Sequence, residues 1–115
     1  MVDVKKNRIT MTRGDTLRVK IGITVNGIEY MPQLGDSIRF AMKHNVFNKT
    51  KTDYAEEKPL VTKEIPYDTL ILQLDPEDTK WLGFGNYAFD IQITFVDGTV
   101  DTFISGDLTL TKEVD

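Results

Sequence analysis

The chain contains no cysteine, which excludes disulfide bonds and thiolate metal sites. Long hydrophobic runs are absent as well, because polar residues repeatedly interrupt the apolar ones. A membrane-spanning helix would need about 20 consecutive apolar residues. Residues 1–8 carry charge with no apolar segment after them, so they lack the pattern of a secretory signal. We therefore expect a protein that is made in the cytoplasm and has no membrane partner.

Residues with catalytic chemistry are scarce. His44 is the only histidine, and no Gly-x-Ser-x-Gly turn is present to carry a nucleophile. The glycine-rich loops that hold nucleotide phosphates and the spaced Asp and Asn loop that holds calcium are also missing. The sequence therefore predicts a non-enzymatic protein with no catalytic residue, no cofactor and no metal site. His44 is expected to be a solvated loop residue.

Basic residues are too few to favour a nucleic-acid partner, because the formal net charge is -4 and phosphate-backbone binding depends on Lys and Arg. The charges are also unevenly distributed. Most of the 14 Lys and Arg lie in residues 1–57, whereas most of the 18 Asp and Glu lie in residues 58–115. Either these charges are scattered over solvent-facing positions, or two surfaces of opposite charge attract one another between copies. The second interpretation leaves a homo-oligomer open.

The feature that the sequence does contain is alternation of apolar and other residues. Leu17, Val19, Ile21, Ile23 and Val25 occupy every second position of residues 16–25. The same period recurs in residues 87–95, whose apolar members are Tyr87, Phe89, Ile91, Ile93 and Phe95. Only a strand places every second side chain on one face, so both segments are predicted to be strands with one buried face.

Shorter segments of the same character lie between turns rich in Gly, Pro, Asn and Asp. Beside the two long strands, we expect strands at residues 7–12, 28–30, 37–42, 60–65, 69–74, 99–104 and 108–111. The tripeptide Arg13-Gly14-Asp15 is interpreted as a turn rather than an adhesion motif. Asp75 and Pro76 begin the one helical segment, near residues 76–82. About seven to nine strands at this spacing predict an all-β sandwich or barrel.

The domain organisation is simple. A length of 115 residues fits a single domain, residues 1–115, and we find no internal repeat or linker. Residues 1–6 are expected to be flexible. Residues 43–58 are polar and have no clear period, which predicts a long loop.

Three features leave alternatives open. Four acids late in the chain fit either a solvated face or the acid pair of a glycoside hydrolase: Asp90, Asp97, Asp101 and Asp107. Trp81 lies next to Leu82 in the short helix and is interpreted as a core or lid residue, with a sugar-stacking platform as the alternative. Tyr87 follows a turn into a long strand, where sandwich domains place a corner tyrosine whose hydroxyl bonds to the backbone upstream.

Five segments occur in a characteristic order. They are Arg13-Gly14-Asp15-Thr16, Gly35-Asp36-Ser37-Ile38-Arg39-Phe40-Ala41-Met42-Lys43, Leu74-Asp75-Pro76-Glu77-Asp78-Thr79, Gly85-Asn86-Tyr87-Ala88-Phe89-Asp90-Ile91 and Gly106-Asp107-Leu108-Thr109-Leu110. In this order they resemble small immunoglobulin-like domains of phages and prophages of Gram-positive bacteria, in particular the N-terminal domain of the phage baseplate upper protein. The similarity spans nearly the whole chain and consists of turn and core residues.

The resemblance implies an immunoglobulin-like antiparallel β-sandwich that is a structural component of a phage or prophage tail or baseplate. It implies residence in the virion and contacts with other tail or baseplate proteins, and it supplies no catalytic residues. Neither the resemblance nor the sequence indicates which residues form the binding surface. The alternative is a carbohydrate-binding or adhesion module on a cell or particle surface, in which aromatic rings would stack on sugars: Trp81, Tyr54, Tyr67 or Tyr30.

Overall fold

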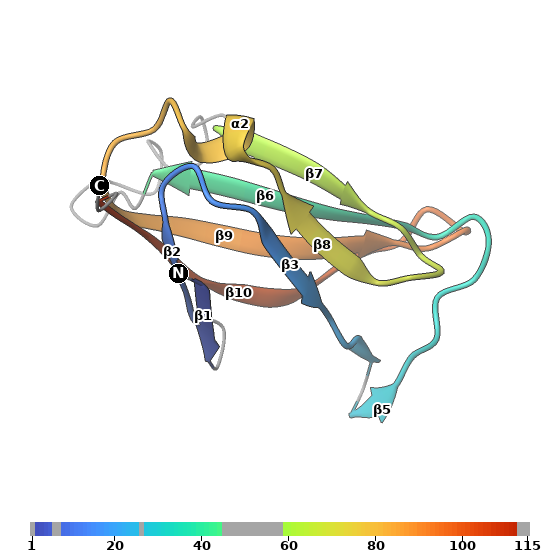
Figure 1. The fold of residues 1–115 in the computed structure, drawn as a ribbon. Helices are drawn as coiled ribbons and strands as arrows, with labels where there is room; N and C mark the ends of the chain where they lie inside the picture. The colour runs from blue at the N-terminus through green and yellow to red at the C-terminus, as the bar shows by residue number, and fades with distance from the viewer. Residues whose placement is uncertain (1, 6–7, 26, 45–58, 113–115) are drawn as a thin grey trace, which may run out of the picture.

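In a computed structural model the chain forms two layers of β-structure with one short helix (Figure 1). The structure describes residues 2–5, 8–25, 27–44 and 59–112. The larger sheet has the strand order β1-β2-β10-β9-β6-β7. Its strands are β1 (Val2–Lys5), β2 (Arg8–Thr12), β10 (Val100–Thr111), β9 (Gly85–Thr94), β6 (Ser37–His44) and β7 (Val61–Ile65).

The second layer is smaller. It consists of β3 (Leu17–Lys20) paired with β8 (Ile71–Leu74), and a short hairpin of β4 (Thr24–Val25) and β5 (Ile28–Glu29) follows β3. Helix α2 (Pro76–Thr79) connects β8 to β9. The predicted all-β sandwich with a short helix is confirmed.

The core lies between the two layers and is built from the alternating residues. The predicted inward face of residues 37–42 is confirmed, because Ile38, Phe40 and Met42 have no exposed surface. On β9 the buried residues are again every second one, from Tyr87 to Ile93. Phe40 stacks on Phe89, with 5.5 Å between the ring centroids. The two-residue repeat of side-chain direction therefore places the apolar residues of β6 and β9 on the face that packs against the β3–β8 pair.

One strand pair departs from the expected antiparallel pattern. Strand β2 runs parallel to β10, with Ile9 opposite Leu108 and Met11 opposite Leu110. The chain leaves β2 through the Arg13-Gly14-Asp15 turn and enters β3 in the other layer, so β2 is free to lie beside the last strand of the larger sheet. The interpretation of this tripeptide as a turn is confirmed, since the Asp15 N–H donates to the Thr12 carbonyl at 3.1 Å.

The strand predicted at residues 16–25 is shorter in the structure. Its antiparallel partner, β8, does not extend far enough to pair with all of it. Leu70 has a φ of 56°, a left-handed conformation that a strand cannot contain. Strand β8 therefore begins at Ile71 instead of Thr69, and the last bond to β3 runs from the Ile21 N–H to the Leu70 carbonyl, at 2.9 Å. Beyond that bond, the chain leaves β3 for the β4–β5 hairpin.

Strand β10 is longer than expected, since residues 105–107 were predicted to separate two strands. Instead Ser105, Gly106 and Asp107 pair with β9, and Asp107 pairs with β2 as well. The β9 ladder pairs all three of these turn-type residues and β2 joins on the other side from Asp107 onward, so the strand continues. The irregularity lies earlier, where the register shifts between Thr102 and Ile104.

Two expectations concern segments that are described only in part. Residues 1–6 were expected to be flexible, yet Val2–Lys5 form β1 and pair with β2. In the loop expected at residues 43–58, Lys43 and His44 belong to β6 and pair with Ala88 and Tyr87. Residues 45–58 lie outside the described residues.

Tyr87 fixes the corner at which the chain enters β9. Its hydroxyl donates a hydrogen bond to the Gly83 carbonyl at 2.7 Å, and the residue is 4% exposed. This is the corner tyrosine that the sequence predicts. The bond holds the α2–β9 connection against the start of the strand.

We expect Tyr87→Phe to lower the free energy of unfolding by roughly 1 kcal/mol, because the Gly83 carbonyl loses its partner while the ring remains. Urea unfolding followed by Trp81 fluorescence measures the change. Tyr67→Phe is the matched control, since the Tyr67 hydroxyl makes no hydrogen bond within the described part of the chain. Equal effects of the two substitutions would contradict a corner role for Tyr87.

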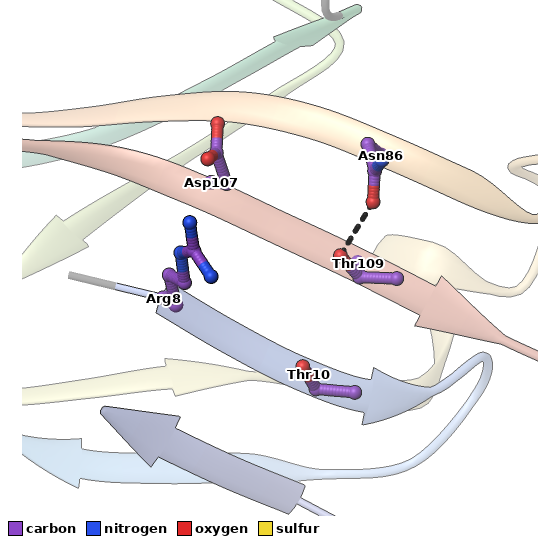
Figure 2. Close-up of a pocket in the computed structure, with 5 residues that line it drawn as sticks. All are labelled: Arg8, Thr10, Asn86, Asp107 and Thr109. Atoms are coloured by element: carbon purple, nitrogen blue, oxygen red, sulfur yellow. Dashed lines mark hydrogen bonds between the residues drawn. The ribbon is translucent and has the colours of Figure 1, made fainter. Parts of the chain in front are cut away.

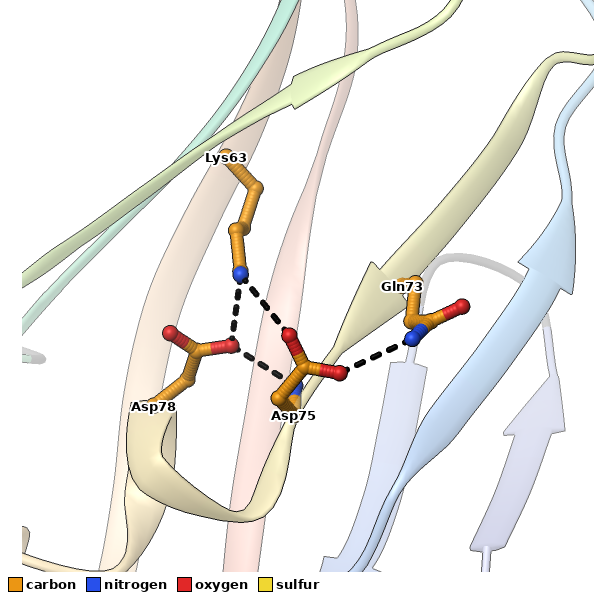
Figure 3. A network of polar contacts seen from close by, with 4 residues as sticks. All are labelled: Lys63, Gln73, Asp75 and Asp78. Atoms are coloured by element: carbon orange, nitrogen blue, oxygen red, sulfur yellow. Dashed lines mark hydrogen bonds and ion pairs between the residues drawn. The ribbon is translucent and has the colours of Figure 1, made fainter.

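A polar network ties the two layers together near α2 (Figure 3). The Lys63 Nζ on β7 lies 3.3 Å from Asp75 Oδ2 and 3.0 Å from Asp78 Oδ2. Gln73 donates to the other Asp75 oxygen at 2.8 Å, and the Asp75 N–H donates to Asp78 at 2.7 Å. The contact with Asp78, followed by that with Asp75, raises the pKa of Lys63. The network fixes α2 and hence the start of the connection to β9.

Candidate protein-binding surface

Two connections meet at one end of the sandwich (Figure 1). They are residues 30–36, between β5 and β6, and residues 95–99, between β9 and β10. The rings of Tyr30 and Phe95 meet edge to face, with 5.3 Å between their centroids. Gly35 is so close to Val96 that a Cβ built on Gly35 would collide with Cγ1 of Val96. The two connections are therefore packed as one unit.

A buried carboxylate organises the first of these connections. Asp36 is 8% exposed, and its Oδ2 accepts hydrogen bonds from the Tyr30 hydroxyl at 2.6 Å and from the Gln33 N–H at 3.0 Å. Burial alone would raise the pKa of Asp36, but the bonds from Tyr30 and Gln33 outweigh burial and the pKa lies below its usual value. The same bond to Asp36 raises the pKa of Tyr30.

The outer side of this unit is apolar although it faces solvent. Leu34 is 79% exposed, Met31 72% and Val96 64%. We call this surface the acidic apolar end, which consists of Met31, Leu34, Val96, Asp97, Val100 and Asp101. Side chains of this size normally gain free energy by leaving water. Their gathering on adjoining connections is typical of a surface that another protein covers.

Gly35 provides a test of how closely the two connections pack. Gly35 and Gly98 both have positive φ angles, 103° and 90°. A Cβ at Gly98 would meet nothing within 4 Å, whereas one at Gly35 would strike Val96. We expect Gly98→Ala to cost roughly 1–2 kcal/mol for the backbone conformation alone, and Gly35→Ala to cost measurably more. Chemical denaturation of both variants measures the difference, and equal losses would contradict the close packing.

The Asp36 carboxylate predicts a pH dependence of stability. Because its pKa is lower in the folded chain than in the unfolded chain, it stabilises the fold above about pH 4 and this contribution is lost as the pH falls below that value. Asp97 acts against this effect through its negative charge. We expect Asp36→Asn to be less stable than the parent at pH 7, with the gap narrowing at pH 3.

Urea unfolding midpoints at the two pH values measure this prediction. Asp68→Asn is the control, because Asp68 is an exposed carboxylate on a neighbouring turn. A gap between Asp36→Asn and the parent that stays constant with pH would contradict the role given to the Asp36 charge.

The opposite end of the molecule has a different composition. Here the β2–β3 turn lies against the α2–β9 connection: the Gly14 N–H donates to Thr79 Oγ1 at 2.9 Å, and Arg13 Nη1 donates to the Leu82 carbonyl at 3.2 Å. The Arg13 guanidinium also lies over the Phe84 ring, 4.3 Å from its centroid. We call this surface the basic aromatic end, which consists of Arg13, Lys80, Trp81, Phe84 and Lys112.

Trp81 does not pack as the sequence suggested. The residue is 61% exposed, whereas its neighbour Leu82 is 4% exposed. Helix α2 ends at Thr79, so the two adjacent side chains follow a turn and point to opposite sides. The interpretation of Trp81 as a core residue is therefore wrong. Phe84 is 50% exposed, so two aromatic rings face solvent at this end.

The outer face of the larger sheet carries a shallow polar hollow of about 280 Å³ (Figure 2). It is lined by Arg8, Thr10, Asn86, Asp107 and Thr109. The Thr109 hydroxyl donates to Asn86 Oδ1 at 2.6 Å, and Arg8 lies opposite Asp107 in the strand register. No aromatic ring is among these lining residues, so the hollow does not provide the stacking face of a sugar site.

The structure does not bring the four late acids into one site. Asp90 lies opposite Ser105 and Asp107 opposite Ala88, in neighbouring strands of the outer face. Asp97 and Asp101 lie at the hairpin end of these strands. Within the described ranges, no three His, Asp or Glu side chains gather as a metal would require. His44 is exposed as expected, but it ends a strand and stacks on Tyr87 at 5.5 Å.

Comparisons with protein-family models, with curated proteins and with solved structures find no match for this chain. Among the residues that the structure describes, no helix has the length and apolarity needed to cross a bilayer. The physical features of the two ends therefore carry the functional argument.

Sequence reasoning identified none of the apolar residues of the acidic apolar end as binding residues. A signal was present in the segment Pro32-Gln33-Leu34-Gly35, where a large apolar residue occupies a turn instead of a strand. The pattern does not show whether such a residue packs beneath a neighbouring connection or faces outward. That distinction depends on the contact between Gly35 and Val96, which are distant in sequence.

Proposed function

We propose that this chain is a non-enzymatic structural or assembly module of a phage or prophage tail or baseplate, working through protein–protein contacts. The observation that carries the proposal is the exposure of Leu34, Met31 and Val96 on two connections packed against one another. Apolar groups held on a rigid support lose little conformational freedom when a partner covers them, which favours a protein interface.

The composition of the opposite end supports the same function. Exposed Trp81 and Phe84 together with Arg13 provide the residue types that are enriched at interfaces and in their most energetic positions. The assignment to a phage or prophage particle comes from the sequence resemblance, and the sandwich fold agrees with the immunoglobulin-like domain that the resemblance implies.

A carbohydrate-binding module receives less support. The polar hollow contains no aromatic ring, and Phe84 is already covered on one face by the Arg13 guanidinium. The Tyr30 ring packs edge to face with Phe95 and its hydroxyl bonds to Asp36, so the ring does not offer a free stacking face. Tyr54 lies outside the described residues. Tyr67 is partly buried against the core. Of the four candidate rings, this leaves Trp81, and one isolated ring is more typical of a protein contact than of a sugar platform.

Particles released by the bacterial host that encodes this chain provide the test. We expect the chain to be present in purified particles, and a photo-crosslinking amino acid at position 34 or 81 to join it to a tail or baseplate protein identified by mass spectrometry. Position 62 is the control, because Thr62 is exposed on β7 away from both ends. Absence from the particles, or equal cross-linking from position 62, would rule the proposal out.

A further inference from the structure

The smaller layer of the sandwich leaves one edge of β3 without a neighbouring strand. Among the described residues β3 pairs with β8 alone, and β8 lies on the side of β7, so the other edge of β3 faces the side of β10 and β2 (Figure 1). The larger sheet has six strands and continues beyond β3 on this side. We call this side of β3, at Arg18 and Lys20, the open edge.

The backbone groups at the open edge are available for hydrogen bonds. The Ile21 N–H donates to the Leu70 carbonyl at 2.9 Å. Because the bonds of an antiparallel pair join every second residue, Val19 bonds to β8 as Ile21 does. The N–H and carbonyl groups of Arg18 and Lys20 therefore point away from β8, and they have no hydrogen-bond partner in the described part of the chain.

An apolar groove of about 200 Å³ opens beside the open edge. Both layers line it, with Val19 on β3, Ile9 on β2, Phe89 on β9 and Ile104 on β10. Val19 and Ile104 belong to the inward-facing residues of their strands, yet both are only partly buried. The core is therefore incompletely covered along β3, and the groove has room for an aliphatic side chain.

The outward side chains of β3 are both basic. Arg18 and Lys20 are exposed, and neither forms an ion pair with another described residue. Glu64 and Asp75 line a hollow beside Arg18, and Glu29 lines one beside Lys20, but none of these carboxylates reaches ion-pair distance. A second copy is a poor occupant, because pairing two open edges would bring like charges together. The open edge therefore favours a segment that carries carboxylates.

We propose that the open edge and its groove bind an extended acidic segment of another protein, which adds to β3 as a further strand. The segment's backbone would form hydrogen bonds with Arg18 and Lys20, as in other peptides that extend a sheet. Successive side chains of a strand point to opposite faces, so its apolar residues would enter the groove while its carboxylates lie beside the two cations. The expected segment alternates apolar residues with Asp or Glu.

A displayed library of random peptides of about eight residues, a typical strand length, tests the proposal with the purified chain as bait. We expect the selected peptides to alternate apolar and acidic residues. The affinity of one selected peptide for the parent chain is then measured by fluorescence anisotropy and compared with its affinity for the variants below.

Lys20→Pro tests the backbone contact. Proline removes the N–H that points away from β8, and it is tolerated on the unpaired side of an edge strand, so the β3–β8 ladder should remain. We expect roughly tenfold weaker peptide binding. Lys20→Gln, which keeps the N–H and removes only the charge, should weaken binding by about two- to fivefold. Lys80→Gln removes an exposed cation outside the site and should bind the peptide as the parent does.

Ile104→Ser tests the groove without altering β3. Because the peptide's apolar side chain would lose its contact with Ile104, we expect roughly tenfold weaker binding. Circular dichroism shows which variants are folded, and this substitution decides the question if Lys20→Pro is not.

Two results would overturn the proposal: a selection that yields no alternating acidic peptide, or a selected peptide whose binding a folded Lys20→Pro or Ile104→Ser variant leaves unchanged. The site lies on a side of the sandwich and goes beyond the proposed function, which concerns the two ends. Peptide binding by a chain that is absent from particles would support this site and remove the proposed function. Failure of the peptide selection would leave cross-linking from positions 34 and 81 unaffected.

Discussion

The fold depends on the burial of one face of β9 while both edges of the strand are paired. Its neighbours β6 and β10 satisfy the backbone on either side, and β3 and β8 cover the face that carries Phe89 and Ile91. A strand with period-2 apolar residues has one register that buries them, because a shift by one residue would expose them all. The positions of both ends of the molecule follow from that register, since β9 connects one to the other.

At each end, a few specific contacts determine which apolar residues are buried and which face solvent. Tyr30 packs on Phe95 and bonds to Asp36, so the backbone around Leu34 and Val96 is held while their side chains point outward. At the other end, Arg13 holds the α2–β9 connection in place by donating a hydrogen bond to the Leu82 carbonyl and by packing over the Phe84 ring. These contacts make the exposed groups part of a formed surface, so binding need not order them at additional cost.

Much of the fold could be predicted from the sequence, because the alternation of apolar and polar residues in a strand can be recognised within one short segment. The inward faces of β6 and β9 follow from period 2 alone, and the Tyr87 hydroxyl bond follows from the position of a tyrosine after a turn. The continuity of β10 could not be predicted, because Gly106 resembles a turn residue until its pairing with Phe89 of β9 is known. The parallel pairing of β2 with β10 joins opposite ends of the chain and leaves no local signal.

The candidate surface was harder to predict for the same reason. Whether Trp81 or Leu82 is buried depends on where a four-residue helix ends, and adjacent apolar residues give no indication of that. The uneven distribution of charge was visible in the sequence, where one interpretation was attraction between copies. It could not be assigned to surfaces, because strands from both halves of the chain interleave in the sheets.

Apolar and charged groups would contribute in different ways to the protein contact proposed above. Apolar side chains provide the affinity of a contact, whereas the surrounding charges select orientation and increase the association rate. A chain with a formal net charge of -4 repels its own copies at long range. Under the proposed function, a particle fixes several copies in place and each further contact forms at high effective concentration, so individually weak interfaces become collectively stable. Because β9 is paired on both edges, it sets a fixed distance between the two ends of the molecule.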